Sequence, residues 1–323
     1  LFITVNIYFF WMKIGLDIMG GDYAPKATLE GAAEALEQLK DGQHLVLVGD
    51  KDMASSFFQE KNINPDLFQY VHTSEVIGMG EHPTKAIVQK PNSSISVGFK
   101  MLKEGGLDSF ASAGNTGAML VGSMFSIKTI PGVIRPAIAS IVPKLRGGYG
   151  TMLDVGANAD CKPDNLLQFG ILGSIYVEHI HGIENAKVGL LNIGEEEEKG
   201  NLLSQAAYNL MKDTQFFNFA GNIEGRDLFN DKADVIVCDG FTGNVVLKLA
   251  ESFYVLTMKK GMNDEFFDRL NYEEIGGSPI LGVNAPVIIG HGISSPKAIR
   301  NMVLHSKEMI ENKIIDKFKA AFN

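Results

Sequence analysis

The stretch at residues 186–212, AKVGLLNIGEEEEKGNLLSQAAYNLMK, contains the pattern that decides the fold. It starts with a short apolar run typical of a buried strand, continues through a polar loop, and ends in a segment with helical spacing of its apolar residues. The same order recurs where KIGLD precedes ATLEGAAEALEQL, HLVLVG precedes DMASSFFQEK, and ADVIVCDG precedes NVVLKLAESFYVLTMKKG. Strands that alternate with crossover helices form parallel sheets covered on both faces. We therefore predict a doubly wound, three-layer α/β/α fold.

Two regions depart from this alternation. RPAIASIVPK and GGYGTMLDVG indicate two strands around a turn, and SPILGVNAPVIIGHG indicates another pair. We expect these hairpins as insertions in a single catalytic α/β domain over residues 12–323, where they can build a second lobe or a subunit surface. Residues 1–11 are apolar but about half as long as the ~20 residues of a spanning helix. Because Met12 follows them directly, we predict that they are an upstream extension.

Composition limits the function classes. Of the 323 residues, 45% are hydrophobic, which is enough for a large core, and the 29 basic and 38 acidic residues give a net charge of -9. This balance disfavours a nucleic-acid surface. The two cysteines, Cys161 and Cys238, have neither the spacing of a zinc site nor the density of a disulfide-stapled secreted domain, so we expect a reducing cytoplasm.

Ligands of doubly wound sheets bind beyond the carboxyl ends of the strands. Five polar, glycine-containing loops are expected there and should converge on one site: DIMGGDYAP, SAGNTG, DVGANADCKP, NIGEEEEKGN and CDGFTGN. In SAGNTG (residues 112–117), two glycines enclose an Asn-Thr pair between an apolar run and a helix-forming segment. Such a turn presents backbone N–H groups at a helix N-terminus, where they favour an anion.

Neither a dinucleotide-binding GxGxxG nor a Walker motif occurs at a strand-to-helix turn, so the loops favour a small anion or a phosphate held by backbone N–H groups. Asp17 and Asp22 flank IMGG, but without a third ligand they indicate loop-ordering hydrogen bonds, and we expect no metal. His179 and His181 are interpreted as C-terminal helix caps. His291 is a minor candidate for the site because it lies in a glycine-flanked loop.

Cys161 precedes a predicted helix, a position that lowers a thiol pKa, and it could carry an acyl group. No histidine lies nearby in sequence as an activating base, so we favour a packing role. Lys162 and Lys199 each lie in a strand-end loop close to a helix start. Their point charges would complement a phosphate.

Eight blocks of the sequence, in order, closely resemble the bacterial phosphate acyltransferase (PlsX) family: LDIMGGDYAP, EHPTKAIVQKPNSSISVGFKML, SAGNTGAML, IPGVIRPAI, LDVGANADCKPDNLLQFG, VGLLNIGEEEEKGN, GNIEGRDLF and VIVCDGFTGNVVLK. The resemblance implies transfer of a long-chain acyl group from acyl-(acyl-carrier-protein) to inorganic phosphate, which gives acyl phosphate for phospholipid synthesis. It also implies a homodimer without a cofactor, a fold similar to phosphate acetyltransferases and isocitrate and isopropylmalate dehydrogenases, and interaction with the membrane glycerol-3-phosphate acyltransferase.

This reaction needs no catalytic triad, because phosphate is largely a dianion near neutral pH and a thiolate is a fair leaving group. It requires an anion held against a carbonyl and donors for the oxyanion. We predict catalytic roles for Lys199 on phosphate, Asn244 on the oxyanion, and Asn115. The predicted substrate-binding residues are Asp17, Gly20, Gly21, Asp22, Gly114, Thr116, Gly117, Asn158, Lys162 and Gly243.

Two other functions stay open, namely phosphate acetyltransfer with acyl-coenzyme A and a non-catalytic scaffold for lipid-synthesis enzymes. A nicotinamide-dependent dehydrogenase would need a cluster of acidic metal ligands that the sequence lacks.

We expect the apolar run at residues 118–130 in a dimer interface. Residues 251–267 are expected to make weak peripheral membrane contact. The acidic carrier is expected to dock on a basic cluster of Lys128, Arg135, Lys144 and Arg146.

Overall fold

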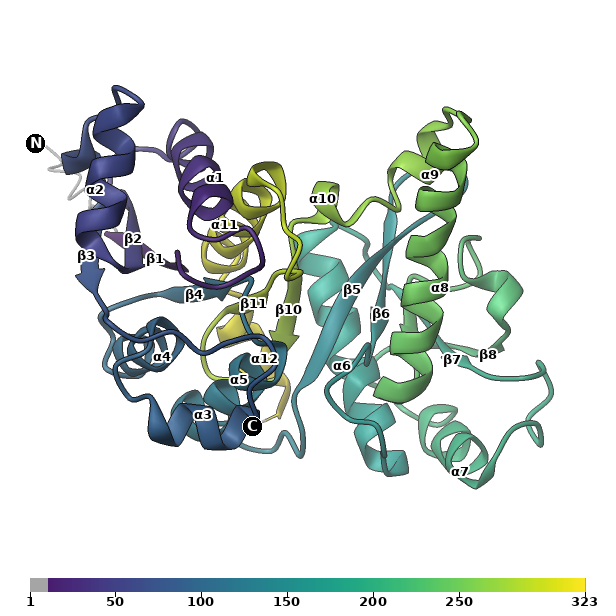
Figure 1. Ribbon diagram of the computed structural model, residues 1–323. Helices are drawn as coiled ribbons and strands as arrows, with labels where there is room; N and C mark the ends of the chain where they lie inside the picture. The colour runs from purple at the N-terminus through teal and green to yellow at the C-terminus, as the bar shows by residue number, and fades with distance from the viewer. Residues whose placement is uncertain (1–10, 323) are drawn as a thin grey trace, which may run out of the picture.

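The computed structural model describes residues 11–322. They form an 11-stranded sheet of order β3-β2-β1-β4-β11-β10-β5-β6-β9-β7-β8 with helices on both sides, as predicted (Figure 1). The extension predicted at residues 1–11 lies outside the described residues, apart from Trp11, whose ring stacks on His44. The strands are β1 (Met12–Asp17), β2 (Gln43–Gly49), β3 (Gln69–His72), β4 (Ser109–Ser112), β5 (Ala137–Pro143), β6 (Tyr149–Leu153), β7 (Lys187–Leu191), β8 (Asn218–Ile223), β9 (Val235–Val237), β10 (Ser278–Leu281) and β11 (Val287–Ile289).

Two hydrophobic cores form, one on each face of the sheet. One face, here called the α1 face, is covered by α1 (Lys26–Leu36), α2 (Lys51–Glu60), α6 (Pro163–Ile180), α7 (Leu202–Met211), α11 (Pro296–Glu311) and α12 (Ile314–Phe322). The opposite face, the α8 face, is covered by α3 (Pro83–Gln89), α4 (Ser94–Lys103), α5 (Thr116–Gly122), α8 (Gly240–Lys259) and the short α9 (Glu265–Asp268). Apolar side chains of the strands therefore pack against helices on both sides.

The two predicted hairpins are present, as the antiparallel pairs β5–β6 and β10–β11. These hairpins also reverse the direction in which the strands of the sheet run. Strands β1 to β4 and β11 form a parallel first half, and β6 to β9 form a parallel second half. Three antiparallel steps separate the halves, from β11 to β10, to β5 and to β6, so the halves run in opposite directions. The strand alternation alone did not predict this reversal.

Each half contains a point where neighbouring parallel strands send their helices to opposite faces. In the first half, β1 leads to α1 on one face and β4 leads to α5 on the other. In the second half, β7 leads to α7 and β9 leads to α8. Such points leave a crevice beyond the strand ends, where ligands of open α/β sheets bind. We call the crevice between β1 and β4 the first crevice and that between β7 and β9 the second crevice.

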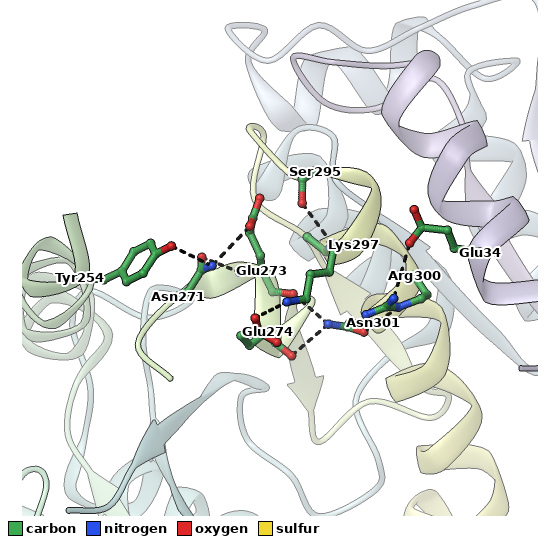
Figure 2. A network of polar contacts seen from close by, with 10 residues as sticks. Glu34, Tyr254, Asn271, Glu273, Glu274, Ser295, Lys297, Arg300 and Asn301 are labelled. Carbon is green, nitrogen blue, oxygen red and sulfur yellow. Dashed lines mark hydrogen bonds and ion pairs between the residues drawn. The ribbon is translucent and has the colours of Figure 1, made fainter. Parts of the chain in front are cut away.

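A polar network connects α8 to α11 across the sheet (Figure 2). Asn271 donates its amide to the Tyr254 hydroxyl of α8 at 3.3 Å, and Asn301 of α11 donates to the backbone carbonyls of Glu273 and Glu274 at 2.9 and 3.1 Å. These five residues flank or belong to α10 (Tyr272–Ile275) and to the helices on either side. The network is extended by the ion pairs Lys297–Glu274 and Arg300–Glu34. It fixes α8 relative to the first half.

Candidate active site

The first crevice is filled by its own loops. Asp17, fully buried, accepts hydrogen bonds from the Ser112 hydroxyl at 2.6 Å and from the backbone N–H groups of Met19 and Gly20 at 2.9 and 3.2 Å. Burial raises the pKa of the Asp17 carboxyl, and these hydrogen bonds oppose that rise. A Cβ on Gly20 would lie 2.7 Å from the Gly114 nitrogen. Asp17 therefore orders the loops, and no ligand-sized space separates these backbones.

Asn115 also orders backbone. Its Oδ1 accepts from the Ala118 N–H at 2.9 Å and caps α5, while its Nδ2 donates to the carbonyls of Gly78, Met79 and Glu81 at 3.0 to 3.1 Å. The side chain is 4% exposed. The structure thus gives Asn115, predicted to be catalytic, the geometry of a positioning residue, whereas its neighbour Thr116 is exposed.

A second buried carboxylate orders the loop after β6. Asp154 accepts from the backbone N–H groups of Gly156, Ala157 and Asn158 at 2.7 to 3.1 Å, and from the Asn158 side chain at 2.8 Å. Burial raises the pKa of the Asp154 carboxyl. A Cβ on Gly243 would lie 1.9 Å from the Asp154 carbonyl oxygen, so only glycine lets the first turn of α8 pack on this loop.

Between the two halves lies a cavity of about 200 Å³, which we call the central cleft. Thr116 and Gly292 line it from the first half, and Asn244 and Lys248 line it from α8. The Lys248 ammonium lies 2.8 Å from the Glu251 carboxylate. The cleft also includes Gly156 and His291, whose Nε2 is 3.6 Å from Glu251 and whose pKa is lowered, chiefly by burial and then by Lys248. The central cleft therefore brings together the Lys248 ammonium, the Asn244 amide, the Thr116 hydroxyl and backbone groups of its glycines. Such groups in a small space can bind a small anion.

The second crevice contains a cavity of about 400 Å³. Thr242 and Val246 line it, whereas Asn244 and Lys248 face the central cleft, so the first turns of α8 separate the two cavities. The loop that carries the exposed Lys199 borders the second crevice through Gly200 and Asn201. The five loops expected to converge on one site therefore do not line a single cavity. They border the central cleft, the second crevice with an adjoining cavity at Cys161, and the filled first crevice.

Other predicted binding residues take varied positions. Lys162 is exposed at the N-terminus of α6, where its N–H donates to the Asn165 side chain at 2.8 Å. Asp22 is exposed, and its N–H donates to the Gly292 carbonyl at 2.6 Å, which joins the first loop to the cleft wall. Gly21 packs against the same carbonyl. Gly117 packs on Pro83 in the first turn of α5.

Cys161 is half-buried near the second crevice. Burial, followed by the negative charges of Asp154 and Asp239, raises the pKa of its thiol to about 11. We expected the helix start to lower the pKa of this thiol, and that prediction is wrong. Desolvation and two nearby carboxylates outweigh the effect of the helix. A thiol of this pKa is protonated at neutral pH and is a poor nucleophile.

His181 is the C-cap residue of α6, as predicted, and its backbone N–H donates to the Val177 carbonyl at 3.0 Å. Burial lowers the pKa of its imidazole to about 4, and its Nε2 lies 3.2 Å from the Thr151 hydroxyl, so the residue caps the helix in its neutral form.

The basic docking cluster is only partly available. Lys144, expected in a basic docking cluster, is 8% exposed and forms an ion pair with Asp234. The apolar run at residues 118–130 is only partly exposed, through Met124 and Phe125 among others.

Comparison with known proteins identifies the family. A family model described as "Fatty acid synthesis protein" matches residues 12–266. The phosphate acyltransferase of Dictyoglomus turgidum is 42% identical over 331 residues, which cover 97% of this chain and 98% of the relative. That of Desulforamulus reducens is 43% identical over 330 residues, which cover 95% and 96%. The chain belongs to the phosphate acyltransferase (PlsX) family. It is an acyltransferase with phosphate as acceptor, as the sequence blocks indicated.

Solved structures of other acyltransferases share the fold. A phosphotransacetylase from Streptococcus pyogenes aligns with a TM-score of 0.65 at 16% identity, over 93% of this chain and 94% of that one. A branched-chain phosphotransacylase from Enterococcus faecalis aligns with a TM-score of 0.61 at 14% identity, over 93% and 99%. The predicted similarity to the phosphate acetyltransferase fold is confirmed.

The sequence analysis missed Lys248. It follows Asn244 by four residues, and residues four apart lie on the same face of a helix. Since α8 was predicted and Asn244 was already a candidate, this spacing in NVVLK was a usable signal.

Proposed function

We propose that this acyltransferase moves a long-chain acyl group from acyl-(acyl-carrier-protein) to inorganic phosphate in the central cleft, for use in phospholipid synthesis. The observation that carries the proposal is the position of Asn244 and Lys248 one helical turn apart on α8, facing Thr116 and Gly156 across a cavity of about 200 Å³. Lys248 supplies the positive charge for phosphate in the cleft, whereas Lys199, the lysine that the sequence favoured, lies in a loop that borders the second crevice.

In the proposed reaction, an oxygen of hydrogen phosphate attacks the thioester carbonyl carbon. The Asn244 amide donates a hydrogen bond to the oxyanion that forms, and the Thr116 hydroxyl and Lys248 orient the phosphate. The C–S bond then breaks, and the proton of the hydrogen phosphate passes to the departing thiolate. The products are acyl phosphate and the free carrier thiol. The protonated Cys161 takes no part in this direct transfer.

The carrier is proposed to dock near the second crevice. Arg135 is exposed and donates to the carbonyl of Asp160, a residue at the mouth of a cavity that also includes Cys161 and Phe241. Arg146, also expected in the docking cluster, pairs with Asp231 and lies in the turn before β6, at the opposite end of the strands from the second crevice. The Arg135 guanidinium, with Lys128, can attract an acidic carrier although the whole chain is negatively charged.

We further propose that the enzyme works as a cytoplasmic homodimer at the membrane surface and delivers acyl phosphate to the membrane glycerol-3-phosphate acyltransferase. Exposed apolar side chains support these contacts, namely Phe125 before β5, and Phe253 and Leu256 on α8, which are 70%, 38% and 51% exposed. Among the residues that the structure describes, no helix has both the length and the apolarity to cross a bilayer.

The test is detection of acyl phosphate by mass spectrometry after the protein is mixed with phosphate and palmitoyl-(acyl-carrier-protein), with a phosphate-free control. We expect palmitoyl phosphate and stoichiometric release of carrier thiol. Turnover with acetyl-coenzyme A but not with the carrier would replace the proposal with acetyl transfer. No turnover with any acyl thioester would favour a scaffold.

A further inference from the structure

The central cleft has little room for the donor. A cavity of about 200 Å³ can hold phosphate and a reacting carbonyl, but a long acyl chain needs a separate apolar space. We infer that the second crevice binds the acyl chain of the donor. This inference rests on the proposed function, since it assigns a place to one part of the proposed substrate.

The free space favours the second crevice over the first. Both lie where neighbouring strands send helices to opposite faces, which is where open α/β sheets bind ligands. The first is closed by Gly20 against Gly114. The second retains a cavity of about 400 Å³ between α6, α7 and α8. Of these two crevices, only the second has space for an added chain.

The lining matches an alkyl chain. The floor and walls are apolar and consist of side chains from both hydrophobic cores: Leu166, Leu190, Leu191, Leu203, Cys238 and Val246. Polar groups gather toward the loops, where Asn201 caps α7 and Asp239 caps α8. A chain that buries its methylenes inside and leaves its carbonyl at the polar end satisfies both parts of this lining.

The rim carries large apolar side chains that water would otherwise surround. Ile193, Leu202 and Phe241 are 79%, 87% and 67% exposed, and each belongs to a loop or first helical turn that borders the second crevice or the adjoining cavity at Cys161. Exposed apolar groups clustered around an apolar opening are typical of a ligand-binding groove. They would cover the part of the chain closest to solvent.

Helix α8 lies between the two cavities and lines both of them. Thr242 and Val246 face the second crevice, and Asn244 and Lys248 face the central cleft. A chain held in the crevice would place its carbonyl at the first turn of α8, where Thr242 is two residues from Asn244. Phosphate and acyl chain would then approach the carbonyl from opposite sides of one helix.

The test is a substitution that narrows the second crevice. In Val246→Phe, the phenylalanine ring occupies space that the far methylenes of the acyl chain would fill. Each methylene excluded from an apolar site costs about 0.8 kcal/mol, or about fourfold in affinity. We expect the KM for the palmitoyl carrier to rise at least tenfold, that for the octanoyl carrier to change by less than threefold, and the KM for phosphate to stay constant. The matched control is Val245→Phe, because Val245 is 53% exposed on the same helix.

A second variant guards against misfolding of the first. Ser204→Leu narrows the crevice from α7 and should shift the chain-length preference in the same direction. If both crevice variants keep the wild-type preference, or if Val245→Phe shifts it equally, the inference is overturned while the proposed function stands. If the wild-type enzyme makes no acyl phosphate from any carrier, the proposed function fails instead.

Discussion

The two crevices of this sheet have the same topology but opposite contents. In the first, the loop after β1 folds back onto the loop after β4, and the Asp17–Ser112 hydrogen bond and the Gly20–Gly114 contact leave no room between them. In the second, the long loop between β7 and α7 stays away from α8, and about 400 Å³ stays open. Neighbouring strands that send their helices to opposite faces create a place where a ligand can bind. The comparison of the two crevices teaches that the sequence of the local loops decides whether this place stays open or is filled by packing.

The largest effect is expected from the two asparagines. Asn244→Ala should lower kcat by ~10²- to 10³-fold, the usual cost of losing one preorganised oxyanion donor. Asn115→Ala should instead lower the free energy of unfolding by about 1 to 2 kcal/mol, because it removes a helix cap. Steady-state kinetics and urea unfolding of both variants measure the two effects. A kcat loss in Asn115→Ala as large as in Asn244→Ala, with stability unchanged, would put chemistry in the first crevice.

The two crevices should also differ in their tolerance of a methyl group. Gly20→Ala places a Cβ 2.7 Å from the Gly114 nitrogen and should cost about 2 to 3 kcal/mol of stability. Gly225→Ala, at the second crevice, meets no heavy atom of the described residues within 4 Å and should stay within about 0.5 kcal/mol of wild type. Urea unfolding of the chain, which we propose behaves as one domain, provides the comparison. Equal losses would show that the second crevice is as closed as the first.

A smaller effect should distinguish the lysines on either side of α8. Lys248→Ala should raise the KM for phosphate about tenfold, because Lys248 lines the central cleft and charge-assisted hydrogen bonds are worth about 1.5 to 3 kcal/mol. We expect Lys199→Ala to raise it less. Phosphate and carrier are varied separately, with Lys259→Ala as control. A larger effect in Lys199→Ala would move the phosphate site toward the second crevice.

The smallest effect is expected at Cys161, beside the second crevice. Cys161→Ser should leave turnover within about twofold of wild type. Its thiol pKa, raised to about 11, keeps it protonated at pH 7, so alkylation by iodoacetamide should be slow and should accelerate as pH approaches that value. Loss of turnover in Cys161→Ser, with an acyl adduct on Cys161 of the wild type in the absence of phosphate, would replace direct attack by a ping-pong mechanism.

Much of the fold could be predicted because each apolar run and each following helix carries its own local pattern. The strand predicted from HLVLVG is β2, and the helix predicted after CDGFTG is α8. The reversal between the halves could not be predicted in this way, because it depends on which strands β5 and β10 pair with, and strand neighbours are a long-range property.

The site was harder to predict than the fold. Glycine and asparagine in a strand-end loop have the same local pattern whether they hold backbone together, as Asn115 does, or face a cavity, as Asn244 does. The difference lies in what the rest of the chain places opposite them. Lys144 shows the same limit, because its ion pair with Asp234 joins residues 90 positions apart.

The most direct test locates the acyl chain by photocrosslinking. A palmitoyl carrier with a diazirine at the end of the acyl chain is bound without phosphate and irradiated, and the labelled peptides are identified by mass spectrometry. We predict labels in residues 186–204 and 238–246, around Leu190 and Val246, that disappear in Val246→Phe. Labels confined to residues 17–25 or 112–119 would place the chain in the first crevice and contradict the account.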